Sequence, residues 1–166
     1  SSESGGKISL LDTIKHGQPT ILIGVSAQPG TFTKEIVQTM ASYTEQPIIF
    51  PLSNPTSRAE ATADQLIQWT QGKAIIATGS PFPPVLFKEV QYHIAQCNNV
   101  YIFPGVGLGV VACKTPRVTE EMFIRAAQVL SSHAPILHDP SAPIFPSLEK
   151  LRTISREIAI AVCQVA

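Results

Sequence analysis

The feature that most constrains the fold of this chain is a regular alternation between short apolar runs and longer amphipathic stretches. Three apolar runs with the length expected of strands buried on both faces occur at residues 20–25, 47–52 and 73–78. The stretches between them, residues 33–43 and 57–70, place apolar side chains on one helical face. Crossovers of this length join parallel strands in a right-handed sense. We therefore predict an α/β fold that contains half of a doubly wound parallel sheet.

The second predicted helix of this region and the rest of the chain carry recognisable helix signals. Ser57 and Glu60 form the S-x-x-E pattern of a capping box at the start of residues 57–70. Further on, residues 105–113, 120–131 and 147–165 have helical patterns, and Thr119 stands at the N-cap position of the middle one. The region that follows the predicted strands is therefore expected to be mainly helical.

Composition and charge exclude several classes of partner and location. The chain has 166 residues, with 12 Lys and Arg against 12 Asp and Glu, and no basic cluster, so neither nucleic acid nor an anionic membrane is an expected partner. No apolar run approaches the roughly 18 residues that a membrane span needs, and the first residues lack the pattern of a secretory signal. Three cysteines without a C-x-x-C pair are expected to be reduced thiols, which predicts a cytoplasmic protein.

Small and polar residues follow each of the three predicted strands, at residues 24–30, 52–56 and 78–82. Ligands of open parallel sheets bind at this carboxyl edge, although tight βα turns favour the same residue types. Asn54 precedes a proline, so its uncharged amide either faces a ligand or forms a turn that caps the next helix. The adjacent amides of Asn98 and Asn99 need partners, which are either a polar ligand or the backbone.

The sequence shows no motif of a dinucleotide fingerprint, a metal site, a catalytic nucleophile or a catalytic carboxylate pair. The glycines at positions 105, 107 and 109 lack the spacing of a dinucleotide fingerprint, and we expect them to serve close helix packing. The four histidines show no metal-binding spacing, and no nucleophile motif or carboxylate pair stands at a strand end. The residues alone therefore predict a binding crevice without visible catalytic acids, bases or metal ligands.

Four stretches of the chain resemble the C-terminal part of malic enzymes, in particular the NAD-linked group. They are PTILIGVSAQPGTF at 19–32, IFPLSNPTSRAEA at 49–61, ATGSPFPPV at 77–85 and IAQCNNVYIFPGVGLGVVAC at 94–113. The resemblance runs from about Leu10 to Val165. It implies an oxidoreductase parent that oxidises L-malate, passes a hydride to NAD or NADP and releases pyruvate and CO2, with Mg or Mn as the metal.

The resemblance also implies roles for individual residues. The family positions that line the dinucleotide correspond to Gly24, Val25, Ser26 and Ala27, and the position at the nicotinamide and the substrate corresponds to Asn54. The positions that contact the substrate correspond to Asn54, Asn98 and Asn99. The family's catalytic Tyr and Lys, its metal ligands and its phosphate-binding glycines lie upstream of residues 20–25 and have no match here. We therefore assign no catalytic or metal-binding residue and expect the isolated chain to be inactive.

The domain organisation that the resemblance implies has four segments. They are a flexible start at 1–10, the C-terminal half of a Rossmann-like NAD-binding domain at 11–97, a return segment toward the substrate domain at 98–146, and a C-terminal helix that packs on the cofactor domain at 147–166. The expected partners are malate or pyruvate, the missing N-terminal part of the same protein, and further copies in a homo-oligomer.

Two alternatives to a malic enzyme remain open on the sequence. Malolactic enzymes, which convert malate directly to lactate and CO2, share TFTKE, PIIFPLSNPT and the paired asparagines, whereas Gly79–Phe82 favours a malic enzyme. The chain could also be a stand-alone nucleotide-binding or assembly module that has lost the chemistry of its ancestor.

Overall fold

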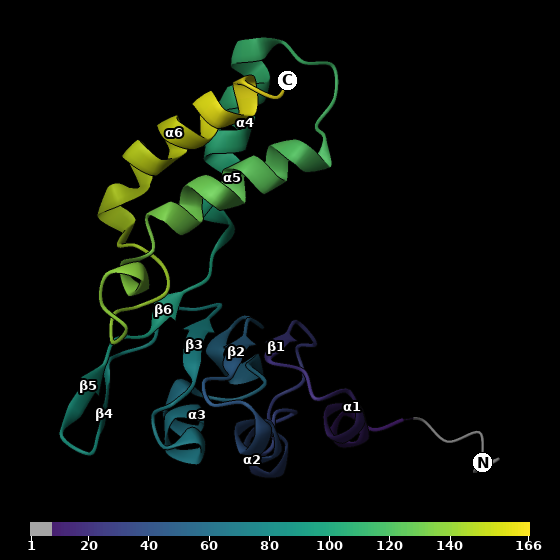
Figure 1. The fold of residues 1–166 in the computed structure, drawn as a ribbon, viewed down its shortest axis with the longest axis vertical. Helices are drawn as coiled ribbons and strands as arrows, with labels where there is room; N and C mark the ends of the chain where they lie inside the picture. The colour runs from purple at the N-terminus through teal and green to yellow at the C-terminus, as the bar shows by residue number, and fades with distance from the viewer. Residues whose placement is uncertain (1–7) are drawn as a thin grey trace. The chain divides into compact units, whose positions relative to one another are not determined.

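The computed structural model describes residues 8–166 and divides them into two compact units, one ending at Gln96 and the other running from Cys97 to Ala166 (Figure 1). Most of the predicted flexible start, residues 1–10, lies outside the described residues. Ser9 already acts as the N-cap of the first helix, where its side chain accepts a hydrogen bond from the Asp12 N–H. The predicted segment boundaries at 97 and 146 stay predictions.

The first unit is built on a parallel sheet, which confirms the predicted fold class. Its strands, in spatial order, are β1 (Ile21–Gly24), β2 (Ile48–Pro51), β3 (Ile75–Thr78) and β6 (Ala95–Gln96). Its helices are α1 (Leu10–Gly17), α2 (Lys34–Tyr43) and α3 (Ala63–Thr70), with a short 3-10 helix, η1 (Thr56–Arg58), after β2. The order β1–β2–β3 follows the chain, as expected for one half of a doubly wound sheet.

The three helices lie side by side along the strands (Figure 1), and they bury one face of the sheet. Leu22, Ile49 and Ile76 occupy paired register positions on this face and belong to the same core as the inward side chains of the helices. Consecutive right-handed crossovers that advance in one direction place their helices on one face, which explains this arrangement.

The opposite face of β1 corrects a prediction from the sequence. We expected this strand to be buried on both faces, but Ile21 and Ile23 are 50% and 56% exposed. The helices described for this unit pack on the Leu22 side, and β1 stands at the end of the sheet among the described residues. An apolar strand face in this position is typical of a surface that another part of a protein covers.

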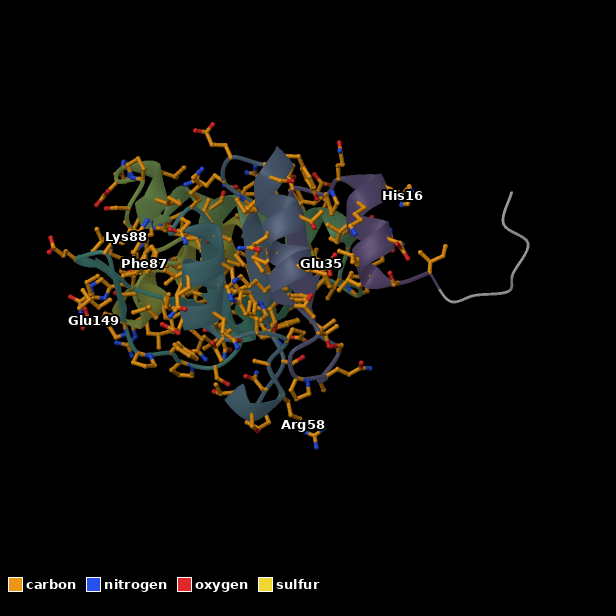
Figure 2. The ribbon with its side chains drawn as sticks, turned by 90° about the horizontal axis from the view of Figure 1, so that it is seen from below. His16, Glu35, Arg58, Phe87, Lys88 and Glu149 are labelled. Atoms are coloured by element: carbon orange, nitrogen blue, oxygen red, sulfur yellow. A yellow bond between two sulfur atoms is a disulfide. The ribbon has the colours of Figure 1, made fainter. Side chains whose placement is uncertain are left out.

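An antiparallel hairpin of β4 (Val85–Phe87) and β5 (Val90–Tyr92) leaves the sheet between β3 and β6. Its turn residues Lys88 and Glu89 have positive φ angles. Figure 2 shows Lys88 beside Phe87 at this turn, where the Lys88 ammonium lies 5.2 Å from the ring centroid. The sequence patterns do not predict this hairpin.

The second unit is helical, as predicted. It contains α4 (Phe103–Cys113), α5 (Glu120–Ser132) and α6 (Leu151–Cys163), with short 3-10 helices at Asn99–Tyr101 (η2), Pro135–Leu137 (η3) and Leu148–Lys150 (η4). Pro104 stands in the first turn of α4, and Thr119 caps α5, both as expected. The helix predicted over 147–165 differs from expectation, because its first turn is the 3-10 helix η4 and α6 begins only at Leu151.

Two glycines let α4 approach α6 closely. A Cβ atom at Gly105 would lie 2.7 Å from Ile158 Cβ, and one at Gly109 would lie 2.8 Å from Val162 Cβ. Gly107 faces open space, with nothing within 4 Å of such a Cβ. The interpretation of these glycines as packing residues is therefore confirmed for Gly105 and Gly109 and is wrong for Gly107.

The cysteines also differ from expectation. Cys113 and Cys163, at the ends of α4 and α6, are joined in a disulfide with their Cα atoms 5.7 Å apart, so the prediction of three reduced thiols is wrong for this pair. Cys97 is a free, partly buried thiol. Within residues 8–166, no helix combines the length and apolar character needed to cross a membrane.

Candidate functional site

The candidate site is the carboxyl edge of the parallel sheet, where the loops after β1, β2 and β3 lie next to one another. Strand register sets this proximity, because Gly24 is paired with Pro51 and the Leu52 N–H donates to the Gly24 carbonyl at 2.8 Å. The Gly79 N–H likewise donates to the Pro51 carbonyl at 3.3 Å. The structure therefore brings Gly24, Val25, Ser26, Ala27 and Asn54 to a common edge, as the sequence predicted.

Asn54 connects the loop after β2 to the loop after β3. Its Oδ1 accepts a hydrogen bond from the Ser80 Oγ, and the Asn54 side chain does not cap η1, whose N-cap is Pro55. The turn-capping alternative is therefore not what the structure contains. Because the carbonyl oxygen of this exposed side chain is engaged by Ser80, its Nδ2 group is left to donate to a ligand.

Gln96 extends the same edge to the last strand of the sheet. Its Nε2 donates to the Gly79 carbonyl at 3.2 Å, and the Thr78 hydroxyl donates to the Ser80 carbonyl at 2.8 Å. These contacts fix the loop after β3 from both sides. The edge thus consists of uncharged hydroxyl, amide and backbone groups.

Glu60 lies beneath these loops and was not recognised from the sequence as a site residue. Its side chain is fully buried, with 0% exposure. Its Oε1 accepts hydrogen bonds from the Ser26 N–H at 2.8 Å, the Ser26 hydroxyl at 2.9 Å and the Ser53 hydroxyl at 2.5 Å. The Ser53 Oγ in turn accepts a hydrogen bond from the Ala27 N–H at 2.8 Å. One carboxylate therefore holds the loops after β1 and β2 together.

The prediction that Ser57 and Glu60 form a capping box is wrong. The capping box belongs to Thr62 and Gln65, five residues further along, and α3 begins only at Ala63. Ser57 lies in η1, and Arg58, the last residue of this 3-10 helix, projects from the molecule into solvent (Figure 2). Both segments match the general capping-box pattern S/T-x-x-E/Q, as Ser57 with Glu60 and as Thr62 with Gln65. Only Thr62 stands directly before a sustained apolar periodicity.

The ionisation of Glu60 follows from its surroundings. Burial by itself raises the pKa of this carboxyl, but the hydrogen bonds from Ser53 and Ser26 outweigh burial and hold the pKa below its ordinary value of 4.5. The group is therefore a carboxylate at neutral pH. Its charge is stabilised by neutral donors of the loops, which makes the loop geometry and the ionisation of Glu60 interdependent.

Two glycines of the sheet edge have no room for a side chain. A Cβ atom at Gly24 would lie 2.6 Å from the Glu60 Cδ and 2.7 Å from the Phe32 ring. At Gly79 it would collide with the Leu52 carbonyl. Both glycines are therefore required for the close approach of the strand ends and of Glu60.

Asn98 and Asn99 belong to the second unit, at its start. The Asn98 Oδ1 accepts a hydrogen bond from the Val100 N–H at 2.9 Å and so caps η2, which is the backbone alternative considered above. Both side chains are exposed. The Asn98 carbonyl oxygen is thus engaged locally, while its amide nitrogen remains a donor.

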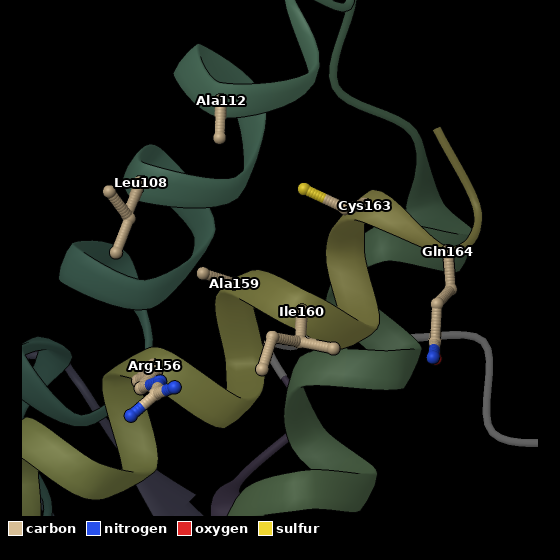
Figure 3. Close-up of a pocket in the computed structure, with 7 residues that line it drawn as sticks. All are labelled: Leu108, Ala112, Arg156, Ala159, Ile160, Cys163 and Gln164. Atoms are coloured by element: carbon tan, nitrogen blue, oxygen red, sulfur yellow. The ribbon is translucent and has the colours of Figure 1, made fainter.

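An open groove of about 450 Å³ lies in the second unit between α4 and α6 (Figure 3). Leu108 and Ala112 face Ala159 and Ile160 across it, and Arg156 and Gln164 are its only strongly polar side chains. None of the predicted site residues lines this groove, so it is not the candidate site. No group of three or more His, Cys, Asp or Glu side chains suited to a metal ion occurs in the described part of the chain.

Comparisons with known proteins agree with this architecture. The family model described as malic enzyme, NAD binding domain, matches residues 1–166. The NAD-dependent malic enzyme of Shewanella loihica is 52% identical over 159 residues, and that of Acinetobacter baylyi is 50% identical over 159 residues. Each match covers 96% of this chain and 28% of the relative, so the chain spans little more than a quarter of the length of these proteins.

A solved structure supports the same fold. The crystal structure of Entamoeba histolytica malic enzyme is similar with a TM-score of 0.74 at 24% identity, over 96% of this chain and 29% of that one. The parallel sheet, the family model over the full length and the relatives at half identity or better lead to one conclusion: this chain belongs to the malic enzyme family, within its NAD-binding domain.

Proposed function

We propose that this chain is part of a longer malic enzyme that oxidises L-malate and decarboxylates it to pyruvate and CO2 with NAD. The support is the match to NAD-dependent malic enzymes at about half identity over 96% of the chain, which covers only 28% of their length. NADP remains the alternative cofactor. On this proposal the protein is cytoplasmic and homo-oligomeric, and the rest of the same polypeptide is the principal partner of the chain.

The observation that carries the proposal is the uncharged edge formed by Gly24–Ala27, Asn54 and Ser80. These groups fit a nicotinamide, because an amide donor such as the Asn54 Nδ2 complements a carboxamide or a ribose hydroxyl without adding charge. In the proposed enzyme, residues 24–27 line the dinucleotide, Asn54 orients the nicotinamide and the substrate, and Asn98 and Asn99 bind the substrate. The chemistry that NAD supplies when bound is acceptance of the hydride from C2 of malate.

The divalent metal and the proton-transferring groups are proposed to reside in the remainder of the protein. Residues 8–166 offer no cluster that fits Mg or Mn, and no residue of the chain matches the family's catalytic Tyr or Lys. We assign to this chain the binding and orientation of the cofactor and substrate, and no step of proton transfer.

The reaction is tested by assaying the full-length protein and the isolated chain side by side with malate, NAD and Mn. We expect the full-length protein to form NADH and pyruvate in equal amounts and the isolated chain to form neither. Lactate without net NADH would favour the malolactic alternative. Turnover by the isolated chain would contradict the proposed division of labour, and absence of turnover by the full-length protein would favour a binding or assembly module.

A further inference from the structure

Glu60 combines complete burial with hydrogen bonds from the candidate binding loops after β1 and β2. Its side chain is 0% exposed, and its carboxylate accepts from Ser26 and Ser53 but from no residue of α2 or α3. Burying a carboxylate is costly unless it is fully hydrogen-bonded. An apolar side chain would fill this space at lower cost. The hydrogen-bond partners of the Glu60 carboxylate therefore indicate that its charge acts on the two loops.

The hydrogen bonds of Glu60 set the backbone path of both loops. The Ser26 N–H donates to it directly, and the Ala27 N–H donates to the Ser53 Oγ, whose own hydroxyl hydrogen is given to Glu60. Ala27 has a left-handed φ of 54°, a conformation that is uncommon for a residue with a Cβ, and its N–H is held by the Ser53 Oγ. Ser53 directly precedes Asn54, so the same carboxylate fixes the start of the loop that carries the Asn54 amide.

We propose that Glu60 is a positioning residue, which holds the Ser26–Ala27 backbone and the Ser53–Asn54 segment in the arrangement that binds the cofactor. Glu60 does not touch the cofactor or the substrate in this proposal, which rests on the function proposed above. Gly24 contributes to the same arrangement. A Cβ atom at this position would lie 2.6 Å from the Glu60 Cδ, so only glycine leaves space for the Glu60 side chain.

The proposal is tested in the full-length protein with Glu60→Gln, which keeps the shape of the side chain but removes its charge and half of its accepting capacity. We expect the dissociation constant for NADH, measured by fluorescence titration, to rise about tenfold, the size of effect that loss of a charged hydrogen-bond acceptor gives. The KM for NAD should rise by a similar factor, with a smaller change in kcat. Hydrogen exchange of the Ser26 and Ala27 amides should accelerate in the same variant.

Two further variants keep the test decisive if Glu60→Gln folds poorly. Ser53→Ala removes the acceptor of the Ala27 N–H and should weaken NADH binding in the same direction, and the double variant should be less weakened than the sum of the two single effects. Glu45→Gln, at an exposed position, is the matched control and should leave NADH binding unchanged.

The outcomes separate this proposal from the proposed function. If the wild-type protein binds NADH and the Glu60 and Ser53 variants bind it equally well while their amides exchange faster, Glu60 is merely structural and the proposal is overturned. If the wild-type protein itself shows neither NADH binding nor malate oxidation, the proposed function fails, and the positioning role fails with it for that separate reason.

Discussion

At the scale of single residues, the contrast between Asn54 and Glu60 shows what a sequence can and cannot indicate. The local sequence pattern makes Asn54 a candidate, because an asparagine before a proline at a strand end presents its amide away from the strand. Glu60 was assigned to a helix cap because its nearest sequence partner, Ser57, has the matching type. Its actual partners, Ser26 and Ser53, are 34 and 7 residues away, and only the register of β1 and β2 brings them together.

The acid stability of the chain provides a prediction at this scale. The pKa of Glu60 is lowered in the folded state, so its contribution to stability is complete above the ordinary carboxyl pKa of 4.5 and is lost as the pH falls further. We expect Glu60→Gln to lower the free energy of unfolding by about 1–3 kcal/mol at pH 7. The variant should also lose less stability than the wild type on acidification below pH 4.5.

Denaturant unfolding at pH 7 and at acid pH, with Glu45→Gln as the control, measures both effects. Parallel acid profiles of the wild type and Glu60→Gln would show that this carboxylate does not contribute in the way described.

At the scale of elements, the apolar runs predicted β1, β2 and β3 to within two residues at each end, since buried parallel strands have a strong apolar signal. The hairpin of β4 and β5 was less visible, because its turn is Lys88–Glu89 rather than the Asn-Gly or Asp-Gly that favours positive φ angles. The early start expected for α3 was wrong because a second cap, at Thr62, lies closer to the apolar periodicity. Local signals thus fixed the type of each major element better than its boundaries.

The three glycines of α4 provide a prediction at this scale. Ala at position 105 or 109 places a Cβ within 3 Å of α6, so we expect Gly105→Ala and Gly109→Ala each to destabilise the chain by about 1–3 kcal/mol. Gly107→Ala meets nothing within 4 Å and should stabilise α4 by about 0.5–1 kcal/mol, because alanine is the better helix former. Thermal or denaturant unfolding of the three variants measures the difference. Equal effects at all three positions would contradict the close packing of α4 on α6.

At the scale of the whole molecule, the fold class followed from the alternation of strand and helix patterns, and the family followed from motifs spread over the chain. What the sequence did not indicate is the uncovered face of β1, where Ile21 and Ile23 are half exposed. An apolar run looks the same in sequence whether the strand is covered by helices of its own unit or by other parts of a protein, so the sequence does not distinguish the two cases. An exposed apolar face at the end of a sheet is consistent with a chain that spans 28% of the length of its relatives.

The central claim is that the uncharged edge carrying Asn54 binds the cofactor and the substrate in the full-length protein. Its most direct test is the kinetics of Asn54→Ala with malate and NAD, with Ser57→Ala, an exposed neighbour, as the control. We predict a fall of about tenfold to a hundredfold in kcat/KM for Asn54→Ala, as expected for loss of a hydrogen bond to the reacting species, and no change for the control. An Asn54→Ala enzyme that is as active as the wild type would contradict the account.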